Sequence, residues 1–465
     1  MNVYKKNEYS NVANPLTSMS IQIFLYLITK TPLIMKKLLV IFSFLPICVP
    51  FSSLMADGFQ IPQQSTKSTA FGGAFTGYCG DASTAFYNPG GMNNLHGQNF
   101  TAGIIGLFPY VSVQTPATAN ITQTSKIYTP IGLYYVGSFW NSVRIGLAIN
   151  NQFGSSVSYP SQWEGQYIVQ SIELKTYMFQ PTVSYQICKQ LSVGAGFVYT
   201  FGTFSDTKAI PVASSQYSNG EASLSGNGNA VGYNVGLFSK IWQHGNDSAN
   251  NQLLQIGMSY RSGLPMKVSS GNVSFSQIPA SLATEFPSSE NFSTQVNMPA
   301  VFTAGLAYKF SCCKNWDFMV TYDFNYVFWN TYDSLHFNFT NTNTPSQGFH
   351  YNWKNATAHR FGAEATYMKN YSIRMGYYID NTPIQNGYVS PEIVDANATG
   401  FCLGVGIKFC QHYSVDLSYL RSDFTWNNTT WNNPSGGSES LAGPDFSASY
   451  HRIVNMFGIG VNYQF

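Results

Sequence analysis

Three arginines lie in segments where large apolar residues occupy every second position, and their guanidinium groups could bind an anion. The three are Arg144, Arg261 and Arg374. In a β-strand this spacing places each guanidinium on the face opposite the apolar residues. There it could receive the head group of an anionic ligand, because arginine matches the geometry of a carboxylate. It could equally form an ion pair with Glu364, Asp323 or Asp380, and the sequence leaves both interpretations open.

Other side chains that carry chemistry show no pattern of a catalytic or metal site. The sequence contains no G-x-S-x-G motif, and its seven histidines, among them His336 and His359, show no catalytic spacing. Its seven cysteines lack the spacing of metal ligands. We therefore expect neither an enzyme nor a bound metal or other cofactor.

The composition indicates which elements position these residues. Only 9% of the 465 residues are charged, against roughly 25% in a soluble protein, while 44% are hydrophobic and 16% aromatic. The mature part of the chain has no run of ~20 apolar residues that would form a transmembrane helix. This combination favours an all-β fold, a transmembrane antiparallel β-barrel, over the alternative of soluble β-sandwiches. The net charge of +2 gives no reason to expect a nucleic-acid partner.

The last nine residues, Phe457–Phe465, carry the alternation most clearly. Large apolar side chains stand at the odd positions, and glycine, asparagine or glutamine at the even ones. One face of such a strand suits lipid and the other suits a small or polar lumen. A strand that ends on a C-terminal phenylalanine resembles the assembly signal of bacterial outer-membrane barrels. The resemblance implies insertion into the outer membrane of a Gram-negative cell, with Phe465 recognised by the barrel-assembly machinery.

Seven further segments repeat this alternation, and every charged residue in them lies opposite the apolar face. The segments are 143–150, 191–200, 256–261, 302–310, 361–367, 373–380 and 402–409. Their charged residues are Arg144, Arg261, Lys309, Glu364, Arg374, Asp380 and Lys408. An arginine or lysine on the lipid face costs roughly 2–4 kcal/mol at the membrane midplane, so a membrane strand demands this segregation. We expect all of these charged residues to face the lumen.

The connections between these segments are of two kinds. Short ones are expected near Lys189-Gln190, Lys314-Asn315, Lys369-Asn370 and Gln411-His412. Long polar ones are expected over 205–228, 268–296, 333–352 and 424–448. Short periplasmic turns and long extracellular loops are the usual asymmetry of an outer-membrane barrel, which assigns the long loops to the cell surface.

The first 56 residues are expected to be an N-terminal extension and a signal peptide. Lys36-Lys37, an apolar run over 38–45 and the small residue Ala56 have the order of a secretory signal, with cleavage after Ala56. Met35 is then the expected start, and residues 1–34 are an extension.

Residues 57–98 are rich in glycine, serine and threonine and lack sustained alternation. They could form a tail or a plug. A solvated tail would expose Phe59, Phe71, Phe75 and Phe86 to water, so a plug inside the barrel is favoured.

Several motifs, in order along nearly the whole mature chain, resemble the FadL/TodX family of outer-membrane transporters for long-chain fatty acids and other hydrophobic compounds. They are Asp57-Gly58-Phe59-Gln60, Gly72–Gly77, Asp81–Met92, Trp163 with Gly165–Tyr167, Ser192–Phe197, Gly232–Gly236, Ile256–Ser262, and Arg374–Tyr377 with Asp380, Thr382 and Pro383. The Asp81–Met92 motif is similar to the family's hatch, which ends with Asn-Pro-Ala. Gly90 stands here in place of that alanine, which keeps the turn and is expected to loosen the packing.

The resemblance implies a barrel of about 14 strands over 99–465, with its lumen plugged by an N-terminal hatch over 57–98. It also implies passive diffusion. A ligand captured at the outer loops passes to an apolar pocket beside the hatch and leaves sideways through a gap at a kinked strand. The kink matches Gln152–Gly154, and glycine inside a strand permits a bulge. Alternatively, Gly154 merely ends a strand.

Roles for ligand-binding residues follow from the same resemblance. Phe59 is expected to line the tunnel, and Lys208 to meet the ligand head group, beside the three arginines as candidate cations. Trp163 and Tyr167 could line the pocket or could belong to the aromatic belt at the membrane interface.

The structural roles concern the hatch and the kink. The predicted hatch residues are Gly58, Asn88, Pro89 and Gly90. Proline fixes φ and asparagine bonds nearby backbone, so both suit a rigid turn. The predicted residues of the lateral-gap kink are Phe153 and Gly154.

One alternative function is an aqueous porin, which would need an unplugged lumen lined by many charges. Within hydrophobic transport, the sequence does not decide between fatty acids and aromatic hydrocarbons, because both pass apolar tunnels. The expected partners are a long-chain fatty acid or other hydrophobic small molecule and outer-membrane lipid, with the chain as a monomer.

Overall fold

The computed structural model describes residues 58–116, 121–122, 127–212, 219–245, 251–313, 315–341, 343–344, 347–409, 411–431 and 446–465. The expected start at Met35 and the expected cleavage after Ala56 lie outside these residues. No helix within the described ranges is long and apolar enough to cross a membrane.

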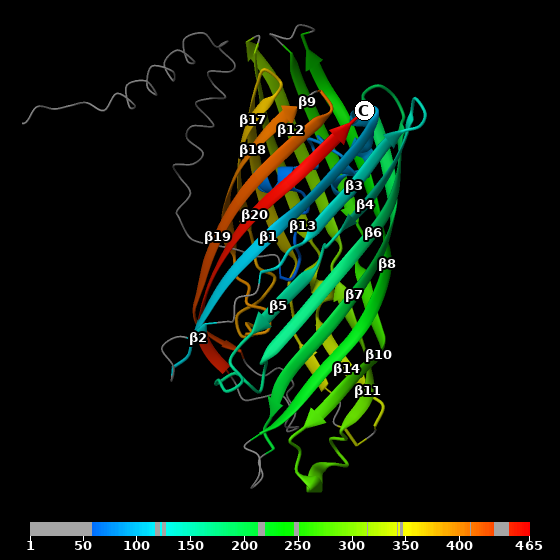
Figure 1. The fold of residues 1–465 in the computed structure, drawn as a ribbon. Helices are drawn as coiled ribbons and strands as arrows, with labels where there is room; N and C mark the ends of the chain where they lie inside the picture. Colours follow the sequence, from blue (N-terminus) through cyan, green and yellow to red (C-terminus); the bar gives the residue numbers. More distant parts are fainter. Residues whose placement is uncertain are drawn as a thin grey trace, which may run out of the picture. The chain divides into compact units, whose positions relative to one another are not determined.

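The wall is a closed antiparallel β-barrel of 14 strands, as the sequence predicted (Figure 1). In chain order the wall strands are β1 (Gln98–Gln114), β3 (Ile131–Ser138), β4 (Val143–Asn150) with β5 (Gly154–Ser158), β6 (Ser171–Gln186), β7 (Leu191–Ile210), β8 (Gly220–His244), β9 (Gln252–Arg261) with β10 (Leu264–Ser276), β11 (Ser289–Met298) with β12 (Val301–Cys313), β13 (Trp316–Val327), β16 (Ala356–Tyr367), β17 (Tyr371–Asp380), β18 (Ala398–Phe409), β19 (Tyr413–Trp431) and β20 (Phe446–Gln464). Closure comes from β20 pairing with β1, where Phe457 lies opposite Gly106. A closed sheet satisfies the backbone of every strand without water, which a membrane requires.

Two short additions extend this wall. Strand β2 (Ile121–Thr122) pairs with the end of β1. The hairpin of β14 (Ser334–Phe339) and β15 (Gln347–His350) joins β11 through β14.

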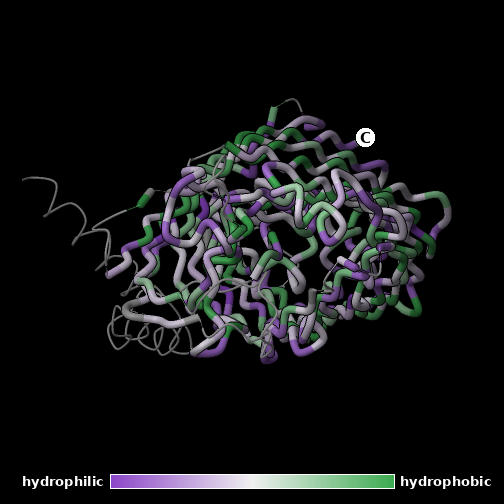
Figure 2. Tube along the Cα trace, turned by 90° about the horizontal axis from the view of Figure 1, so that it is seen from below, coloured by the Kyte–Doolittle hydropathy of each residue, from purple (hydrophilic) through white to green (hydrophobic). Residues whose placement is uncertain are grey.

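The two faces of the wall differ in the way the alternation predicted. On β20, Phe457, Ile459 and Val461 are 56%, 50% and 45% exposed, whereas Gly458 and Gly460 are buried. Hydrophobic and hydrophilic positions alternate along the wall strands (Figure 2). All the charged residues predicted to face the lumen share the register of the buried positions of their strands, so this prediction is confirmed.

Strand β6, which was not among the predicted segments, carries an exception. Its buried positions include Leu174 and Thr176, so Glu173 and Lys175 face outward. Their side chains pair at 2.8 Å. Mutual pairing lowers the cost of placing two charges on the outer face.

The predicted long loops are wrong in their extent. Strand β7 continues to Ile210, and strand β8 already begins at Gly220. Strands β10 and β11 occupy most of 268–296. Ser- and Asn-rich sequence concealed these strands, but Leu224, Val268 and Val273 recur on their buried face. The end of the barrel that carries these extensions is called the long-loop end below. The opposite end, with the turns 187–190 and 368–370, is the short-turn end.

Residues 58–97, called the N-terminal segment below, lie inside the barrel (Figure 1). Helix α3 (Thr66–Ala70) contacts β17 to β20, helix α4 (Thr84–Tyr87) contacts β3, β4 and β6, and the 3-10 helix η1 (Pro89–Asn94) contacts β6, β7 and β8. Ser65 caps α3 by accepting from the Ser68 N–H, and Pro89 starts η1 with its fixed φ. The segment therefore touches opposite parts of the inner wall.

Candidate functional site

The wall is interrupted where β4 ends. Strand β3 pairs with β4 as far as Gly132 opposite Asn150. After residues 151–153 the chain resumes as β5, which pairs with β6 but not with β3 in the described residues. The hydrogen-bonded wall therefore has a lateral opening beside β5. Glycine at position 154 lets the strand restart with a changed direction.

A cavity of about 810 Å³ lies behind this opening. One side is lined by 127–131 and the other by 153–157. Farther inside, the lining includes Asp380, Arg452 and Met456. A volume in this range suits a drug-sized or lipid-sized ligand. The cavity includes Phe153 and Gly154, so the two residues predicted for the kink lie at the wall break and in the cavity lining.

The leading end of the N-terminal segment, residues 58–64, is bonded to the interrupted strand. Gln60 forms an isolated antiparallel bridge with Phe153. Ile61 N donates to Gln152 O at 2.8 Å, and Gly154 N donates to Phe59 O at 3.0 Å. The leading end thus supplies bonds that a continuous β4–β5 strand would have received from a neighbour.

Phe59 lies in a cage of aromatic rings. Its ring centroid is 4.9 Å from Trp329, 5.2 Å from Tyr332, 6.1 Å from Trp353 and 5.9 Å from Phe153. Such edge-on and tilted pairs are each worth roughly 0.5–1.5 kcal/mol beyond the buried area. The cage therefore accommodates a flat apolar ring, and Phe59 is the ring that fills it.

Gly58, the residue before Phe59, lies at a position where a side chain does not fit. Its φ is +57°, and an added β-carbon would lie 2.8 Å from both Trp329 and Trp353. Its N–H donates to Asp395 Oδ2 at 3.3 Å. The position requires glycine through both its conformation and its close approach to the indoles.

Residues 65–94 of the N-terminal segment are called the body below. Asn88 donates to Thr76 O and to Leu237 O on β8, both at 3.0 Å, and accepts from Gly90 N. At Gly90, an added β-carbon would lie 2.8 Å from Gly236 O. This position has little room for a methyl group, so glycine permits a closer backbone approach rather than a looser fit.

Backbone donors of the body point at a carboxylate of the wall. Asp323 Oδ2 accepts from Phe75 N at 3.0 Å and from Thr76 N at 2.8 Å. Beside them, Gly77 faces Gly305, and a β-carbon on either residue would collide with backbone of the other chain segment. The body is therefore hydrogen-bonded to a carboxylate of β13 and packed closely against the backbone of β12.

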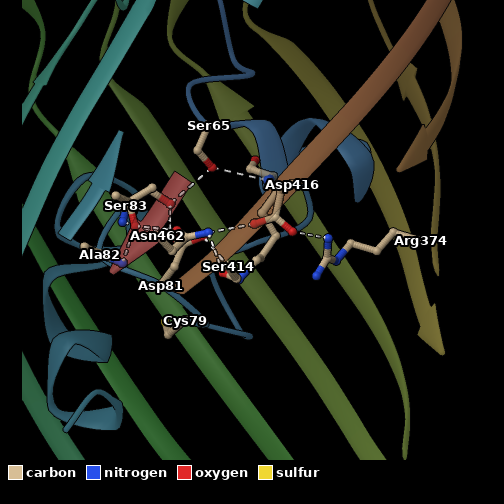
Figure 3. A network of polar contacts seen from close by, with 12 residues as sticks. Ser65, Cys79, Asp81, Ala82, Ser83, Arg374, Ser414, Asp416 and Asn462 are labelled. Atoms are coloured by element: carbon tan, nitrogen blue, oxygen red, sulfur yellow. Dashed lines mark hydrogen bonds and ion pairs between the residues drawn. The ribbon is translucent and has the colours of Figure 1, made fainter. Parts of the chain in front are cut away.

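A second polar anchor joins the body to β17, β19 and β20 (Figure 3). Lys67 lies 3.6 Å from Asp81. Burial opposes its charged form, but Asp416 and Asp81 outweigh this effect and raise the pKa of Lys67 above its ordinary value. Asp416 is bound by Arg374 at 2.6 Å and by Asn462 at 2.7 Å. These charges sit away from bulk water and are mutually compensated.

The three predicted arginines face the lumen but are engaged by the protein. Arg144 donates to Leu95 O at 3.2 Å and to other backbone carbonyls near the short-turn end. Arg261 donates to Phe86 O and to Gln180 Oε1. Arg374 binds both Asp416 and Glu364, each at 2.6 Å. Arg144 and Arg261 thus hold the N-terminal segment directly, and none of the three lines the 810 Å³ cavity.

Lys208 lies apart from this cavity, near the long-loop end. Its Nζ is 5.0 Å from the centre of the Phe349 ring. Glu392 accepts from the Tyr351 hydroxyl at 3.4 Å. Burial, together with the nearby Asp206, raises the pKa of Glu392 to about 7, while Lys208 acts in the opposite direction. Lys208 is therefore close to acidic groups of the protein.

Trp163 and Tyr167 also lie outside the cavity lining. Trp163 is buried, stacks on Tyr159 at 4.3 Å and donates to Val169 O. Tyr167 donates to Asn219 Oδ1 at 2.6 Å. Both belong to packing at the long-loop end.

Several residues of the site were not predicted. They are Lys67, Asp81, Tyr128, Trp329, Tyr332, Trp353, Arg360, Asp395, Asp416 and Arg452. Arg360 had a signal, because it shares the inward register of Glu364, and it pairs with Asp380 at 3.1 Å. The aromatic residues lie in segments without alternation, so only the fold brings them to Phe59. Among the described residues no group of three His, Cys, Asp or Glu could hold a metal ion.

Known proteins share both the sequence pattern and the architecture. The family model described as "Outer membrane protein transport protein (OMPP1/FadL/TodX)" matches residues 49–465. A long-chain fatty acid transport protein of Salmonella typhi is 22% identical over 415 residues, which cover 83% of this chain and 92% of that protein.

Solved structures agree on the fold. A FadL homologue of Pseudomonas aeruginosa superposes with a TM-score of 0.72 at 15% identity, covering 88% of this chain and all of the other. The toluene transporter TodX of P. putida gives 0.62 at 17% identity, with 89% and 99% covered. The match over most of the sequence places this chain in the OMPP1/FadL/TodX family of outer membrane transport proteins.

Proposed function

We propose that this barrel lets long-chain fatty acids, or hydrophobic compounds of similar character, diffuse passively across the outer membrane and leave through the side of the wall. The observation that carries the proposal is the wall break at residues 151–153. It lies beside a cavity of about 810 Å³ and is bonded to the leading end of the N-terminal segment. A ligand that displaces the leading end removes bonds from the same strand that borders the opening.

The route runs from the long-loop end to the opening. A ligand enters above the aromatic cage, displaces the Phe59 ring and reaches the cavity at Phe153. Exit past β5 leads into the outer leaflet of the membrane. The body stays in place during this passage, because its anchors to the wall are many and buried.

The ligand class rests on two supports. The Salmonella relative is named a long-chain fatty acid transport protein, which favours a fatty acid. The aromatic cage around Phe59 favours an aromatic hydrocarbon as the second candidate, since it already holds a ring. We further propose that the protein acts as a monomer in contact with outer-membrane lipid, and that Phe465 is presented to the assembly machinery.

The first test is uptake of radiolabelled oleate, and separately of toluene, by a transporter-deficient strain expressing residues 35–465. Surface folding is checked by the heat-dependent gel mobility of the barrel. We expect uptake above the empty-vector level for at least one of the two compounds. A folded barrel that raises uptake of neither compound would refute hydrophobic transport.

The second test addresses the leading end and the kink. Deletion of residues 57–60 is expected to lower uptake by removing the Phe59 ring, with the barrel still folded. Gly154→Pro is expected to alter uptake, because proline cannot donate the bond from position 154 to Phe59 O. Wild-type uptake by both variants would remove the proposed route.

A further inference from the structure

The polarity of the barrel wall reverses along strands β7 and β8. On the side of the short-turn end, Tyr199 and Phe201 of β7 and Val231 of β8 are exposed apolar residues of the lipid-facing wall. Beyond them, toward the long-loop end, the outward positions carry polar side chains. The buried positions there become apolar, as at Leu224 of β8 and Val268 of β10. An outward face that changes from apolar to polar marks the level at which a barrel leaves the hydrocarbon of the membrane.

The outward residues beyond this level form one continuous surface, called the polar outer face below. Its strands β7, β8, β10 and β11 are successive neighbours in the wall (Figure 1). Its exposed side chains are Ser205, Ser225, Asn227, Asn229, Lys267, Ser269, Ser270, Asn272, Ser274, Ser276, Ser289, Asn291 and Gln295. All of them except the lysine are neutral groups that form hydrogen bonds, and Glu221 adds an acid that is half-buried at the far end of β8.

The composition of this face differs from that of an ordinary water-exposed surface. Such a surface carries roughly 25–35% charged residues of both signs, whereas the exposed side chains here are amides and hydroxyls together with Lys267. Amides and hydroxyls both donate and accept hydrogen bonds, as the hydroxyl groups of sugars do. The scarcity of acids also limits repulsion of an anionic ligand. The face therefore suits a hydroxyl-rich ligand that also carries negative charge.

The lysine of this face lies where the face meets the lipid-facing wall. Lys267 lies opposite Asn229 of β8 and Gln295 of β11. Asn229 lies opposite Phe201, the last exposed apolar residue of β7. Basic residues at this level of a membrane attract the anionic head groups of lipids. Lys267 is thus placed for the phosphate of a lipid whose acyl chains pack beside Phe201.

We propose that the polar outer face binds the sugars of the phosphorylated glycolipid of the outer leaflet, lipopolysaccharide, with Lys267 at its phosphates. The family places the chain in the outer membrane, and the sugars of this lipid extend outward from the leaflet that contacts the lipid-facing wall. The polar outer face therefore continues a contact that membrane insertion already requires. From Thr203 to Ile210, strand β7 rises roughly 23 Å along its axis, which is long enough to lie beside several sugar rings. Such binding fixes the height of this side of the barrel in the leaflet.

The test uses two probes that share acyl chains and lipid phosphates and differ in their sugars. They are lipopolysaccharide with a complete core oligosaccharide, and lipid A. Fluorescently labelled forms of each are titrated into the purified barrel, expressed from residues 35–465, in a nonionic detergent. The test variant combines Ser225→Ala with Asn272→Ala, two residues that face each other across β8 and β10. The matched control combines Thr425→Ala with Ser447→Ala, exposed outward residues of β19 and β20 at the same end of the barrel.

We expect the wild-type barrel to bind core-bearing lipopolysaccharide at least fivefold more tightly than lipid A. Loss of two neutral hydrogen-bonding groups should weaken that binding about fourfold or more in the test variant, while its affinity for lipid A stays within twofold of wild type. The control variant should match wild type within twofold for both probes, and heat-dependent gel mobility confirms that each variant is folded. Equal wild-type affinity for the two probes, or an unchanged test variant, overturns the inference. An equal loss in the control variant also overturns it, because the sugars would then coat the barrel without a site.

A single substitution tests the place given to the phosphates. Lys267→Ala removes the cation and keeps the neutral groups, so the affinity for both probes should fall by a similar factor of about two to five. The loss should shrink at high salt, because salt screens an exposed charge. Unchanged affinity of Lys267→Ala for lipid A would contradict this placement. All of these measurements are made on the purified barrel, so a failure of the proposed transport would leave their outcome unaffected.

Discussion

The body and the leading end of the N-terminal segment are neighbours in sequence but are held to the barrel in different ways. The body donates two backbone bonds to the buried Asp323, places the charge of Lys67 near the buried Asp416, and fits glycine against glycine on the wall. The leading end is bonded by a short backbone bridge to a broken strand and by the rings around Phe59. The first arrangement resists displacement at every point. The second can be exchanged for a ligand that offers an equivalent apolar surface.

This difference indicates that the two parts of one short segment have different roles, since the body fixes the position of the segment and the leading end can be displaced. Buried ion pairs and backbone–backbone contact fix position, because moving them exposes unpaired charge or creates collisions. Aromatic contacts are non-directional enough that a ligand can replace them. A channel that must stay blocked to water yet pass hydrophobic molecules needs both arrangements.

The largest expected effect comes from a glycine of the wall beneath the body. In Gly305→Val, the new side chain would collide with the backbone of Gly77 and with Asp323. Since backbone cannot yield, we expect the body to be displaced and the barrel to lose its heat-resistant gel mobility or to become permeable to small hydrophilic solutes. The control is Gly154→Ala in β5, opposite the leading end, where a β-carbon meets Ile61 and Leu174 at an ordinary 3.4 Å. A stable, sealed Gly305→Val barrel would contradict the steric account of the body.

A smaller but still large effect is expected from the polar anchor. Asp416→Ala leaves the Lys67 and Arg374 charges without this partner, and breaking a buried pair costs about 3–5 kcal/mol. The urea midpoint of the barrel refolded into lipid vesicles should fall accordingly. Lys175→Ala removes an exposed ion pair instead and should change stability by about 0–1 kcal/mol. Equal effects of the two substitutions would show that the buried network adds no more than a surface pair.

Phe59→Ala is expected to affect the leading end alone. The cage loses its ring, so the bridge to the broken strand should open more often. Hydrogen exchange at the amides of Ile61 and Gly154 should accelerate, because both donate in that bridge. The amides of Phe75 and Thr76 should keep their protection through Asp323. Parallel acceleration at both places would mean that the two parts move as one unit.

The smallest effect concerns pH at the cage. Glu392 accepts from Tyr351, whose ring stacks on Tyr332 of the cage at 4.9 Å. The pKa of Glu392 is raised from 4.5 to about 7 in the folded protein, so folding favours its protonated form. Its contribution to local stability is therefore complete below about pH 4.5 and declines as the pH rises through 7. Exchange protection near Tyr351 should fall over this interval in wild type but not in Glu392→Gln, and a body amide such as Thr76 should show no such change.

The sequence by itself determined the barrel. A period of two with charges confined to one face favours a strand between lipid and lumen, and this local rule depends on no partner strand. Strand β6 departs from it, because Glu173 and Lys175 face outward as an ion pair. The sequence also indicated that the N-terminal segment is a plug, since Phe59, Phe71, Phe75 and Phe86 required burial although their segment forms no wall strand. The kink at Gln152–Gly154 was predicted from the family resemblance, and the glycine at 154 agreed with it without excluding a simple strand end.

Only the tertiary structure decided how the charges are used. Arg144, Arg261 and Arg374 shared one pattern in the sequence, yet each meets different protein groups, because their partners come from segments far away in the chain. The cage brings Phe59 to Trp329 and Trp353, about 270 and 294 positions later in the chain, and no local pattern encodes that meeting. Alternation specifies a face for each side chain, whereas closure of the sheet specifies its neighbours.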